Sequence, residues 1–356
     1  MKILMIHNDM SGKGGAIIYV EAISNELKKI GHKVKIISYP KKFLNMKNSA
    51  FFFNKELYFY FKNKIIRFKP DIIHIHNTHK FQNSVYLICF LYSKMYGCKV
   101  VKTFHDYSII ISKKNISSYY NMILNEYIPK YLGLSKIIEK YLLKNFYSIS
   151  PNNELKRLLS GYGIKSEFIP NPISINKKKT YKKINDYTLL YIGTLDKIKG
   201  VKTAIKSMQF LPKKYKLIIL GGGGYDNHLK IISKPYKRIK FIGWKSRDKI
   251  GKYIANSYLV IVPSIVPETG PMVVIEAMFF GKPVIGSNMG GIKELVTKNK
   301  IGLLFEPGNE EDLAKKIDLI SNNKKLYDKF SKNALKSSKK YMLERHMEKL
   351  ISLYNS

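Results

Sequence analysis

The chain of 356 residues is long enough for about two domains, and its 45% apolar and 13% aromatic content excludes a disordered chain. Its two cysteines, Cys89 and Cys98, exclude a disulfide framework and a four-cysteine zinc site, so a reduced, cytoplasmic chain is expected. No apolar run approaches the roughly 20 residues of a membrane span, and the apolar run in the first ten residues is too short for a signal peptide.

Lysine and arginine exceed the acidic residues by 38, a balance that suits nucleic acid, an anionic membrane or an acidic substrate. Residues 1–175 hold 27 basic and 10 acidic residues, and residues 176–356 hold 36 and 15. The excess is therefore spread over both halves. This argues against a nucleic-acid binder, for which a clustered basic face is expected. Two explanations of the excess of basic residues are compositional drift of the whole chain and a contribution of the charge to binding.

Short β-branched runs alternate with longer helical patterns in the first half of the chain. The helical patterns include Ala16–Ile30 and Ser135–Leu143, and the expected strands are Lys2–Ile6, Val34–Ser38, Asp71–Ile75, Lys99–Thr103 and Tyr147–Ser150. Strands and helices that alternate in this way predict βαβ units and a parallel sheet.

The same alternation begins again after Asn171–Asp186, a segment rich in Lys, Asn and Pro that we expect to be a linker. The expected strands are Thr188–Ile192, Lys216–Leu220, Ile239–Ile242, Tyr258–Val262, Pro283–Gly286 and Gly302–Phe305, with helices that include Pro271–Phe280 and Glu310–Ser321. The tail Ser331–Ser356 has a helical, amphipathic pattern. We therefore predict two α/β domains with a cleft between them and ligands at the carboxyl ends of the strands.

The strongest local signal is the segment from Pro263 to Met278, in which a buried strand leads through a loop into a helix. Pro271 suits the first helical position, which places Gly270 at the N-cap and leaves the N–H groups of Met272 and Val273 to bind an anion. Glu276 follows one turn later and can accept hydrogen bonds from two vicinal hydroxyls, as on a ribose. Glu268, in the loop, would reach the group beyond the phosphate. The alternative is a capped surface helix with two solvated glutamates.

Two further glycine turns follow predicted strands. Gly193 and Thr194 lead to Lys199, which is expected near a helix N-terminus, where it would neutralise a pyrophosphate or be a solvated lysine. Gly14 and Gly15 follow the first strand but match neither the dinucleotide fingerprint nor the P-loop. They still allow a ligand to approach the backbone closely.

The histidines are unevenly placed. His105 ends the strand KVVKTF, so it is a site candidate at the carboxyl edge of a sheet. His74 and His76 alternate along another strand, and His79 follows them. A metal site from these three is one interpretation, and a structural role for His74 and His76 is favoured over it.

Seven segments in order resemble the retaining nucleotide-sugar glycosyltransferases of family 4. They are Gly14–Ala16, Lys69–His76, Thr103–Tyr107, Ile169–Pro172, Gly193–Gly200, the E-x7-E element of Glu268 and Glu276, and Gly281–Glu294. The resemblance implies a GT-B fold, with two Rossmann-like βαβ domains facing across a deep cleft. The domains would be residues 1–170 on the acceptor side and 171–335 for the nucleotide sugar. A C-terminal helix, 336–356, would pack back toward the first domain.

The resemblance also implies the roles of individual residues. Lys199 would stabilise the leaving diphosphate, Glu268 would contact the donor sugar, and His105 would approach the reacting centre from the first domain; these three are the candidate catalytic residues. The donor nucleotide sugar, of the UDP or GDP type, would bind to Gly14, Gly15, Gly193, Thr194, Lys199, Gly270, Met272, Val273 and Glu276. No metal or other cofactor is expected, since family members usually need none.

Two departures from the family pattern are visible. The family often has arginine where Thr194 stands, and Pro271 cannot donate the N–H that another residue would give to the sugar.

The function implied is transfer of a hexosyl-type sugar to a glycan or lipid-linked acceptor in glycan, polysaccharide or glycoprotein assembly. Alternatives are a nucleotide-sugar epimerase on the same fold, and a basic protein that binds nucleic acid or a membrane surface. The stretch 41–69 interleaves lysines with aromatic residues, which is typical of a segment that lies on an anionic membrane, here its inner face, but also of a solvated helix with an aromatic core face.

Overall fold

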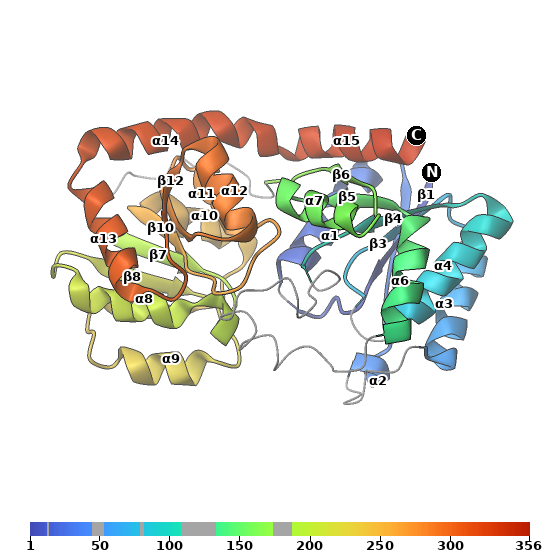
Figure 1. Ribbon diagram of the computed structural model, residues 1–356, viewed down its shortest axis with the longest axis horizontal. Coiled ribbons are helices and arrows are strands. Elements are labelled where there is room, and N and C mark those ends of the chain that lie inside the picture. Colours follow the sequence, from blue (N-terminus) through green and yellow to red (C-terminus); the bar gives the residue numbers. More distant parts are fainter. Residues whose placement is uncertain (13, 45–52, 79–81, 108–132, 174–186) are drawn as a thin grey trace. The chain divides into compact units, whose positions relative to one another are not determined.

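The computed structural model describes residues 1–12, 14–44, 53–78, 82–107, 133–173 and 187–356 (Figure 1). They form two compact units. Unit 1 comprises Met1–Pro170 with His346–Ser356, and unit 2 comprises Asn171–Arg345. Most of the expected linker, residues 174–186, and parts of the stretch 41–69, residues 45–52, lie outside the described residues.

Unit 1 is built on one six-stranded sheet whose paired strands are all parallel, in the order β2-β1-β3-β4-β5-β6. Its strands are β1 (Lys2–His7), β2 (Lys33–Ser38), β3 (Ile72–Ile75), β4 (Lys99–Thr103), β5 (Tyr147–Ser150) and β6 (Ser166–Phe168). Its helices are α1 (Gly15–Lys29), α2 (Lys41–Leu44), α3 (Lys55–Phe68), α4 (Gln82–Tyr96), α6 (Gly133–Lys144), α7 (Asn153–Gly161) and most of α15 (Leu343–Asn355).

Alternation along the strands assigns the helices of unit 1 to two layers. Leu4 and Ile6 of β1 and Ile73 of β3 belong to the core that α3, α4 and α6 cover. His74 lies between two members of that core, so it faces the opposite layer, where it bonds to Tyr354 of α15. Helices α1 and α15 therefore share the second face, which a hydrogen bond from α1 to α15 also indicates.

Unit 2 repeats the plan with a second all-parallel sheet, in the order β12-β11-β10-β7-β8-β9. Its strands are β7 (Thr188–Ile192), β8 (Lys216–Leu220), β9 (Ile239–Gly243), β10 (Leu259–Val262), β11 (Val284–Ser287) and β12 (Gly302–Phe305). Its helices are α8 (Val201–Ser207), α9 (Asp226–Ser233), α10 (Arg247–Asn256), α11 (Met272–Phe279), α12 (Gly290–Asn299), α13 (Glu310–Ser321) and α14 (Lys324–Ser338), with short 3₁₀ turns η1 (Lys197–Lys199), η2 (Met208–Phe210) and η3 (Lys339–Tyr341).

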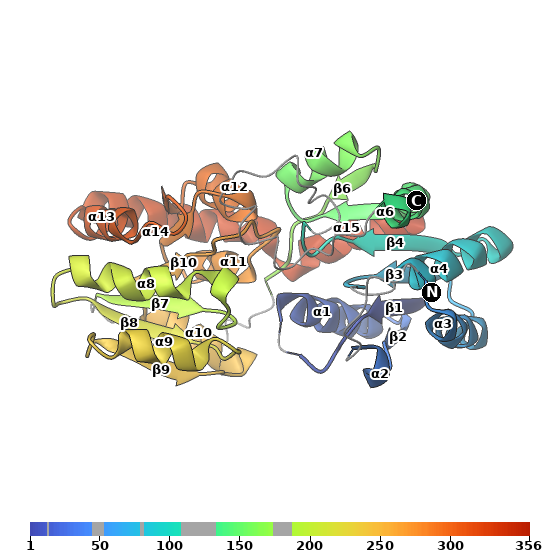
Figure 2. The same cartoon turned by 60° about the horizontal axis from the view of Figure 1, so that its bottom comes forward.

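Two apolar cores lie on opposite faces of the unit 2 sheet. Leu189 and Tyr191 of β7 pack with α8, α9 and α13, whereas Leu190 between them packs with α10, α11 and α12. Figure 2 labels these helices around the strands of the sheet. A strand buried on both faces reads as a continuous apolar run, which is why these strands could be predicted.

The predicted fold class is confirmed: both halves are α/β, with parallel sheets of the predicted strands. Five of the expected strands match to the residue, namely Lys99–Thr103, Tyr147–Ser150, Thr188–Ile192, Lys216–Leu220 and Gly302–Phe305. Strand β6 was not expected, because none of its three residues is buried and they form no apolar run. The tail is not one helix, because the chain is extended at Met342, between η3 and α15. In the described part of the chain, no helix has the length and apolar character needed to cross a membrane.

Candidate active site

Two loops meet at the carboxyl edge of the unit 2 sheet, one after β7 and one after β10. The backbone N–H of Ile265 donates to the carbonyl of Ile198, at 2.9 Å. Gly200 lies against the second loop with φ of 65°, and a Cβ there would be 1.8 Å from the carbonyl oxygen of Pro263. Only glycine fits both the left-handed conformation and the close approach. This glycine contact holds Lys199 beside the loop that carries Glu268.

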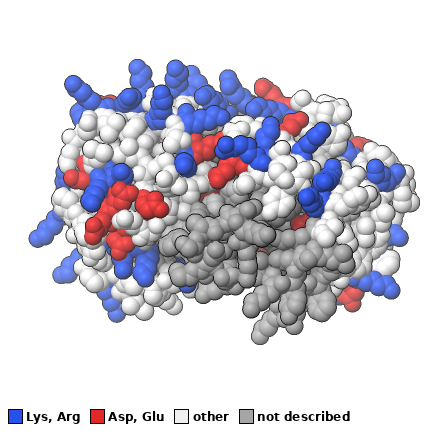
Figure 3. All heavy atoms as spheres, viewed as in Figure 1, with Lys and Arg blue, Asp and Glu red and all other residues white. Residues whose placement is uncertain are grey.

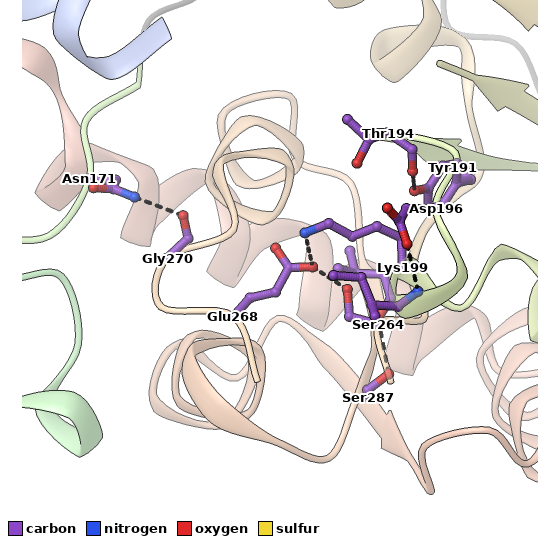
Figure 4. Close-up of polar contacts among 11 residues, drawn as sticks. Asn171, Tyr191, Thr194, Asp196, Lys199, Ser264, Glu268, Gly270 and Ser287 are labelled. Atoms are coloured by element: carbon purple, nitrogen blue, oxygen red, sulfur yellow. Dashed lines mark hydrogen bonds and ion pairs between the residues drawn. The ribbon is translucent and has the colours of Figure 1, made fainter. Parts of the chain in front are cut away.

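Lys199 and Glu268 form an ion pair at the place where the loops meet. Their Nζ and Oε1 atoms are 3.1 Å apart, with side chains 28% and 19% exposed (Figure 4). Ser264 donates from its hydroxyl to the same oxygen of Glu268. Ser264 lies within the segment Pro263–Met278, and the sequence pattern indicated no role for it. The arrangement offers one cation and one carboxylate that are both partly open to a ligand.

Helix α11 begins at Met272, and Pro271 is its N-cap. The prediction that Gly270 is the N-cap was therefore wrong by one residue, because Pro271 has an extended ψ of 109° and lies just outside the helix. No described residue accepts a hydrogen bond from the N–H of Met272 or Val273. The carbonyl of Gly270 accepts from Asn171, and that of Glu268 accepts from the N–H of Gly291. The loop is thus fixed, and two N–H donors remain at the positive end of the helix dipole.

Glu276 is 2% exposed and lies 2.5 Å from Nη2 of Arg247, whose side chain is 27% exposed. Sequence reasoning missed Arg247. One signal could have found it, because Arg247 follows a predicted strand, Ile239–Ile242, and so belongs to the same carboxyl edge. A buried carboxylate needs a cation or hydrogen-bond donors, and Arg247 supplies the cation here.

Gly193 and Thr194 lie in the loop after β7, as predicted from the sequence. The hydroxyl of Tyr191 donates to the carbonyl of Thr194 at 2.8 Å, and the N–H of Gly193 donates to the carbonyl of Leu220. A Cβ on Gly193 would lie 2.7 Å from the Tyr191 hydroxyl. The turn is therefore held by hydrogen bonds to its backbone. In Figure 4, Thr194 is drawn near Lys199, on the same loop.

The remaining candidates belong to the carboxyl edge of the unit 1 sheet. Gly14 is the N-cap of α1, and Gly15 is its first residue. One turn into that helix, the ring of Tyr19 contacts the ring of His105, with centroids 5.0 Å apart. The first turns of α1 and His105 therefore lie at the same carboxyl edge of the unit 1 sheet. His76, from the end of β3, approaches His105 with 3.2 Å between Nδ1 and Nε2.

His74 is held by hydrogen bonds on both ring nitrogens. Its Nδ1 lies 2.7 Å from the hydroxyl of Tyr354, and its Nε2 lies 2.7 Å from that of Thr103. Burial lowers its pKa well below the usual histidine value, so the ring is neutral. The described residues include no cluster of histidine, cysteine and carboxylate side chains that could hold a metal, and His79 lies outside them. The two hydrogen bonds to its ring support the structural role that the sequence favoured for His74.

Basic side chains are distributed widely over the face shown in Figure 3, and a denser row follows α14. The exposed lysines of that helix include Lys325, Lys329, Lys332 and Lys336. At the candidate site, Glu268 pairs with Lys199 and Glu276 pairs with Arg247. The net charge of the chain therefore does not mark the candidate site.

Two family models together match almost the whole chain: Glycosyltransferase Family 4 matches residues 13–177, and Glycosyl transferases group 1 matches residues 173–337. The chain belongs to the family 4 glycosyltransferases. It is 34% identical over 185 residues (51% of this chain and 52% of the relative) to an uncharacterised glycosyltransferase of Haemophilus influenzae. It is 31% identical over 174 residues (48% of each chain) to one of Methanocaldococcus jannaschii.

The match thus spans about half the length of these curated relatives. Among solved structures, the Anabaena HepE protein in complex with UDP and glucose has a TM-score of 0.74 at 19% identity, covering 100% of this chain and 99% of that one. This similarity shows the GT-B fold, which the sequence predicted for this glycosyltransferase family member.

Proposed function

We propose that this family 4 member is a retaining glycosyltransferase that moves a hexosyl-type sugar from a nucleoside diphosphate sugar to a glycan or lipid-linked acceptor. One observation carries the proposal: Lys199, Glu268, Glu276 and the two N–H groups at the start of α11 all lie at one sheet edge of unit 2. Together they provide donors for a diphosphate and carboxylates for sugar hydroxyls.

The proposed chemistry needs charge stabilisation more than it needs a nucleophile. Cleavage of a sugar–phosphate bond leaves negative charge on the diphosphate and positive charge on the anomeric carbon. Lys199 and the N-terminus of α11 would stabilise the diphosphate, and preorganised donors of this kind usually contribute most to catalysis. Glu276 would accept hydrogen bonds from ribose hydroxyls, and Glu268 would hold the donor sugar. No step in this scheme requires a metal.

We propose that the nucleotide of the donor is UDP, so that its base is uracil. Support comes from the similar fold of the Anabaena protein, which was solved with UDP and glucose bound. The test is calorimetric binding of UDP and GDP, followed by turnover of their sugars. We expect UDP to bind more tightly than GDP. Tighter binding of GDP would refute the choice of UDP but would still support a nucleotide site at this sheet edge.

Two variants test the site itself. Glu276→Gln should weaken UDP binding by about tenfold, the effect of about 1.4 kcal/mol. Lys199→Ala should lower turnover by about 10²–10³-fold, as the loss of one preorganised donor does. Lys206→Ala is the matched control, because Lys206 is an exposed lysine of unit 2 that lies 3.8 Å from Glu310. Unchanged kinetics in both site variants would refute the site.

An epimerase with the same fold is separated from a transferase by omitting the acceptor. With labelled UDP-sugar alone, an epimerase converts the sugar, whereas a transferase releases it slowly to water or leaves it intact. Rapid conversion of the donor sugar without acceptor would replace the transferase proposal.

We further propose that the protein lies on the cytoplasmic face of an anionic membrane and contacts it through α3. Phe59 and Ile66 on this helix are 43% and 41% exposed, and Lys62 lies 5.7 Å from the ring of Phe59. Exposed apolar residues among lysines suit an interface of lipid headgroups. Phe59→Ser/Lys62→Glu should reduce sedimentation with vesicles that contain phosphatidylglycerol. Lys329→Glu on α14 changes the net charge by the same amount and should leave sedimentation with the vesicles unchanged. An equal loss of sedimentation in both variants would refute binding through α3.

A further inference from the structure

The carboxyl edge of the unit 1 sheet holds a second histidine next to the candidate His105. His76 follows β3, and His105 follows the neighbouring strand β4. Their ring centroids are 5.4 Å apart with planes inclined by 37°, and Nδ1 of His76 is 3.2 Å from Nε2 of His105. One of these nitrogens must donate a proton and the other must accept it.

The surroundings of His76 decide which nitrogen donates. His76 is fully buried, and no described group hydrogen-bonds to its Nε2 atom. A neutral imidazole carries a single N–H. If that proton were on Nε2, a buried donor would have no acceptor, and unpaired buried donors are rarer than unpaired acceptors.

With the proton on Nδ1, His76 donates it to His105 and leaves only a lone pair unpaired. A second proton on His76 is disfavoured by the buried Lys102, whose ammonium group donates to the carbonyl of His76. Burial and the neighbouring charges accordingly lower the pKa of His76 well below its usual value.

We propose that His76 is a positioning residue that fixes His105 as the Nδ1–H tautomer. Because Nε2 of His105 accepts from His76, its Nδ1 carries the proton. His105 then works as a hydrogen-bond donor through Nδ1–H, toward a sugar or acceptor oxygen, and not as a base at Nε2. The role in turnover rests on the proposed glycosyltransferase function; the tautomer does not.

Tyr19 restricts both rings. Its own ring contacts His76 and His105 edge-on, with centroids at 5.7 and 5.0 Å. Its hydroxyl lies 3.0 Å from Nε2 of His346, and this hydrogen bond fixes the position of the tyrosine. Packing against Tyr19 therefore restricts how the two imidazoles can turn, and the His76–His105 hydrogen bond determines which ring nitrogen of each residue carries the proton.

The tautomer can be measured without substrate. Protein labelled with ¹⁵N-histidine gives long-range nitrogen–proton correlations that distinguish Nδ1–H from Nε2–H, and His105→Asn assigns the signal. We expect His105 to be Nδ1–H in the unsubstituted protein and to lose that preference in His76→Leu. His76→Asn should keep it, since the asparagine amide can donate from about the place of Nδ1. An Nε2–H signal from His105 in the unsubstituted protein overturns the proposal, whether or not the variants fold.

Kinetics test the consequence for turnover. His76→Leu should lower kcat by 10- to 100-fold with little change in KM for the donor, and His76→Asn should recover most of it. His32→Asn is the control, because His32 bonds to the N-terminal amine at the opposite edge of the sheet. Equal kcat in His76→Leu and the control overturns the positioning role. Absence of any transfer by the unsubstituted protein refutes the proposed function, and the nitrogen spectra still decide the tautomer.

Discussion

Replacing Arg247 by methionine removes the cation from a carboxylate that has almost no access to water. Glu276 is 2% exposed, and its Oε1 is 2.5 Å from the guanidinium of Arg247. Methionine preserves the aliphatic length of the side chain, so the variant changes charge more than volume. Unit 2 should be destabilised, because a buried charge that loses its partner is costly.

The size of the effect follows from the geometry. Removing one partner of a buried ion pair typically costs about 3–5 kcal/mol. Arg247 is 27% exposed, so water can partly replace it, and we expect the lower end, about 3 kcal/mol. With a urea slope of about 2 kcal/mol/M, the unfolding midpoint of unit 2 should fall by about 1.5 M.

The chain contains its own probe for this measurement. Its single tryptophan, Trp244, lies three residues before Arg247 and is 49% exposed, so its fluorescence reports on unit 2. Glu276→Gln in the Arg247→Met background removes the buried charge. The double variant should regain at least about 1 kcal/mol of the free energy of unfolding, because substitutions of residues in contact are not additive. An Arg247→Met midpoint equal to that of the unsubstituted protein, or no recovery in the double variant, would refute the reasoning.

Three further outcomes are expected. Gly200→Ala should destabilise unit 2 by about 2 kcal/mol or more, measured by Trp244 fluorescence, because its Cβ would lie 1.8 Å from a carbonyl oxygen at φ of 65°. Gly291→Ala, whose Cβ would lie 2.4 Å from the carbonyl oxygen of Thr269, should move the loop of Glu268 and weaken UDP binding in calorimetry; undiminished affinity would contradict this. Burial lowers the pKa of His346 to about 4, so the unfolded chain takes up a proton below about 6.5 that the folded one excludes. The free energy of unfolding should therefore fall by up to about 3 kcal/mol between pH 6.5 and 4. If the melting temperature of His346→Gln falls as steeply over this pH range as that of the unsubstituted protein, the prediction is wrong.

The fold could be predicted because both sheets are parallel and covered on two sides. Such strands read as short apolar runs, and the helices between them as amphipathic periods. The errors in the predicted secondary structure are confined to short segments. Strand β6 is too short to show a pattern, and the start of α11 was displaced because proline suits the N-cap as well as the first turn here. Neither error moves a candidate residue away from its sheet edge.

The site was less accessible to sequence reasoning, because its partnerships cross from one element to another. Lys199 and Glu268 could be placed at one edge, and they are in contact. The pairing of Arg247 with Glu276 depends on α10 and α11 packing on the same face of the sheet, which follows from strand order. Likewise His76 and His105 were judged separately, although adjacent strands bring them together. Strand order is the information that the sequence pattern lacks.

Ion pairs within the candidate site offset its positive charge, although the chain as a whole has a net charge of +38. Lys199 is paired with Glu268 and Arg247 with Glu276, so each cation already has a carboxylate. In the proposed reaction a diphosphate must compete with Glu268 for Lys199, which lowers the gain from charge alone. The N–H groups of Met272 and Val273 then matter more, because they have no competing acceptor in the described structure. A site of this kind selects a ligand that satisfies the helix terminus and both carboxylates together, so inorganic pyrophosphate should bind less tightly than UDP despite its higher charge.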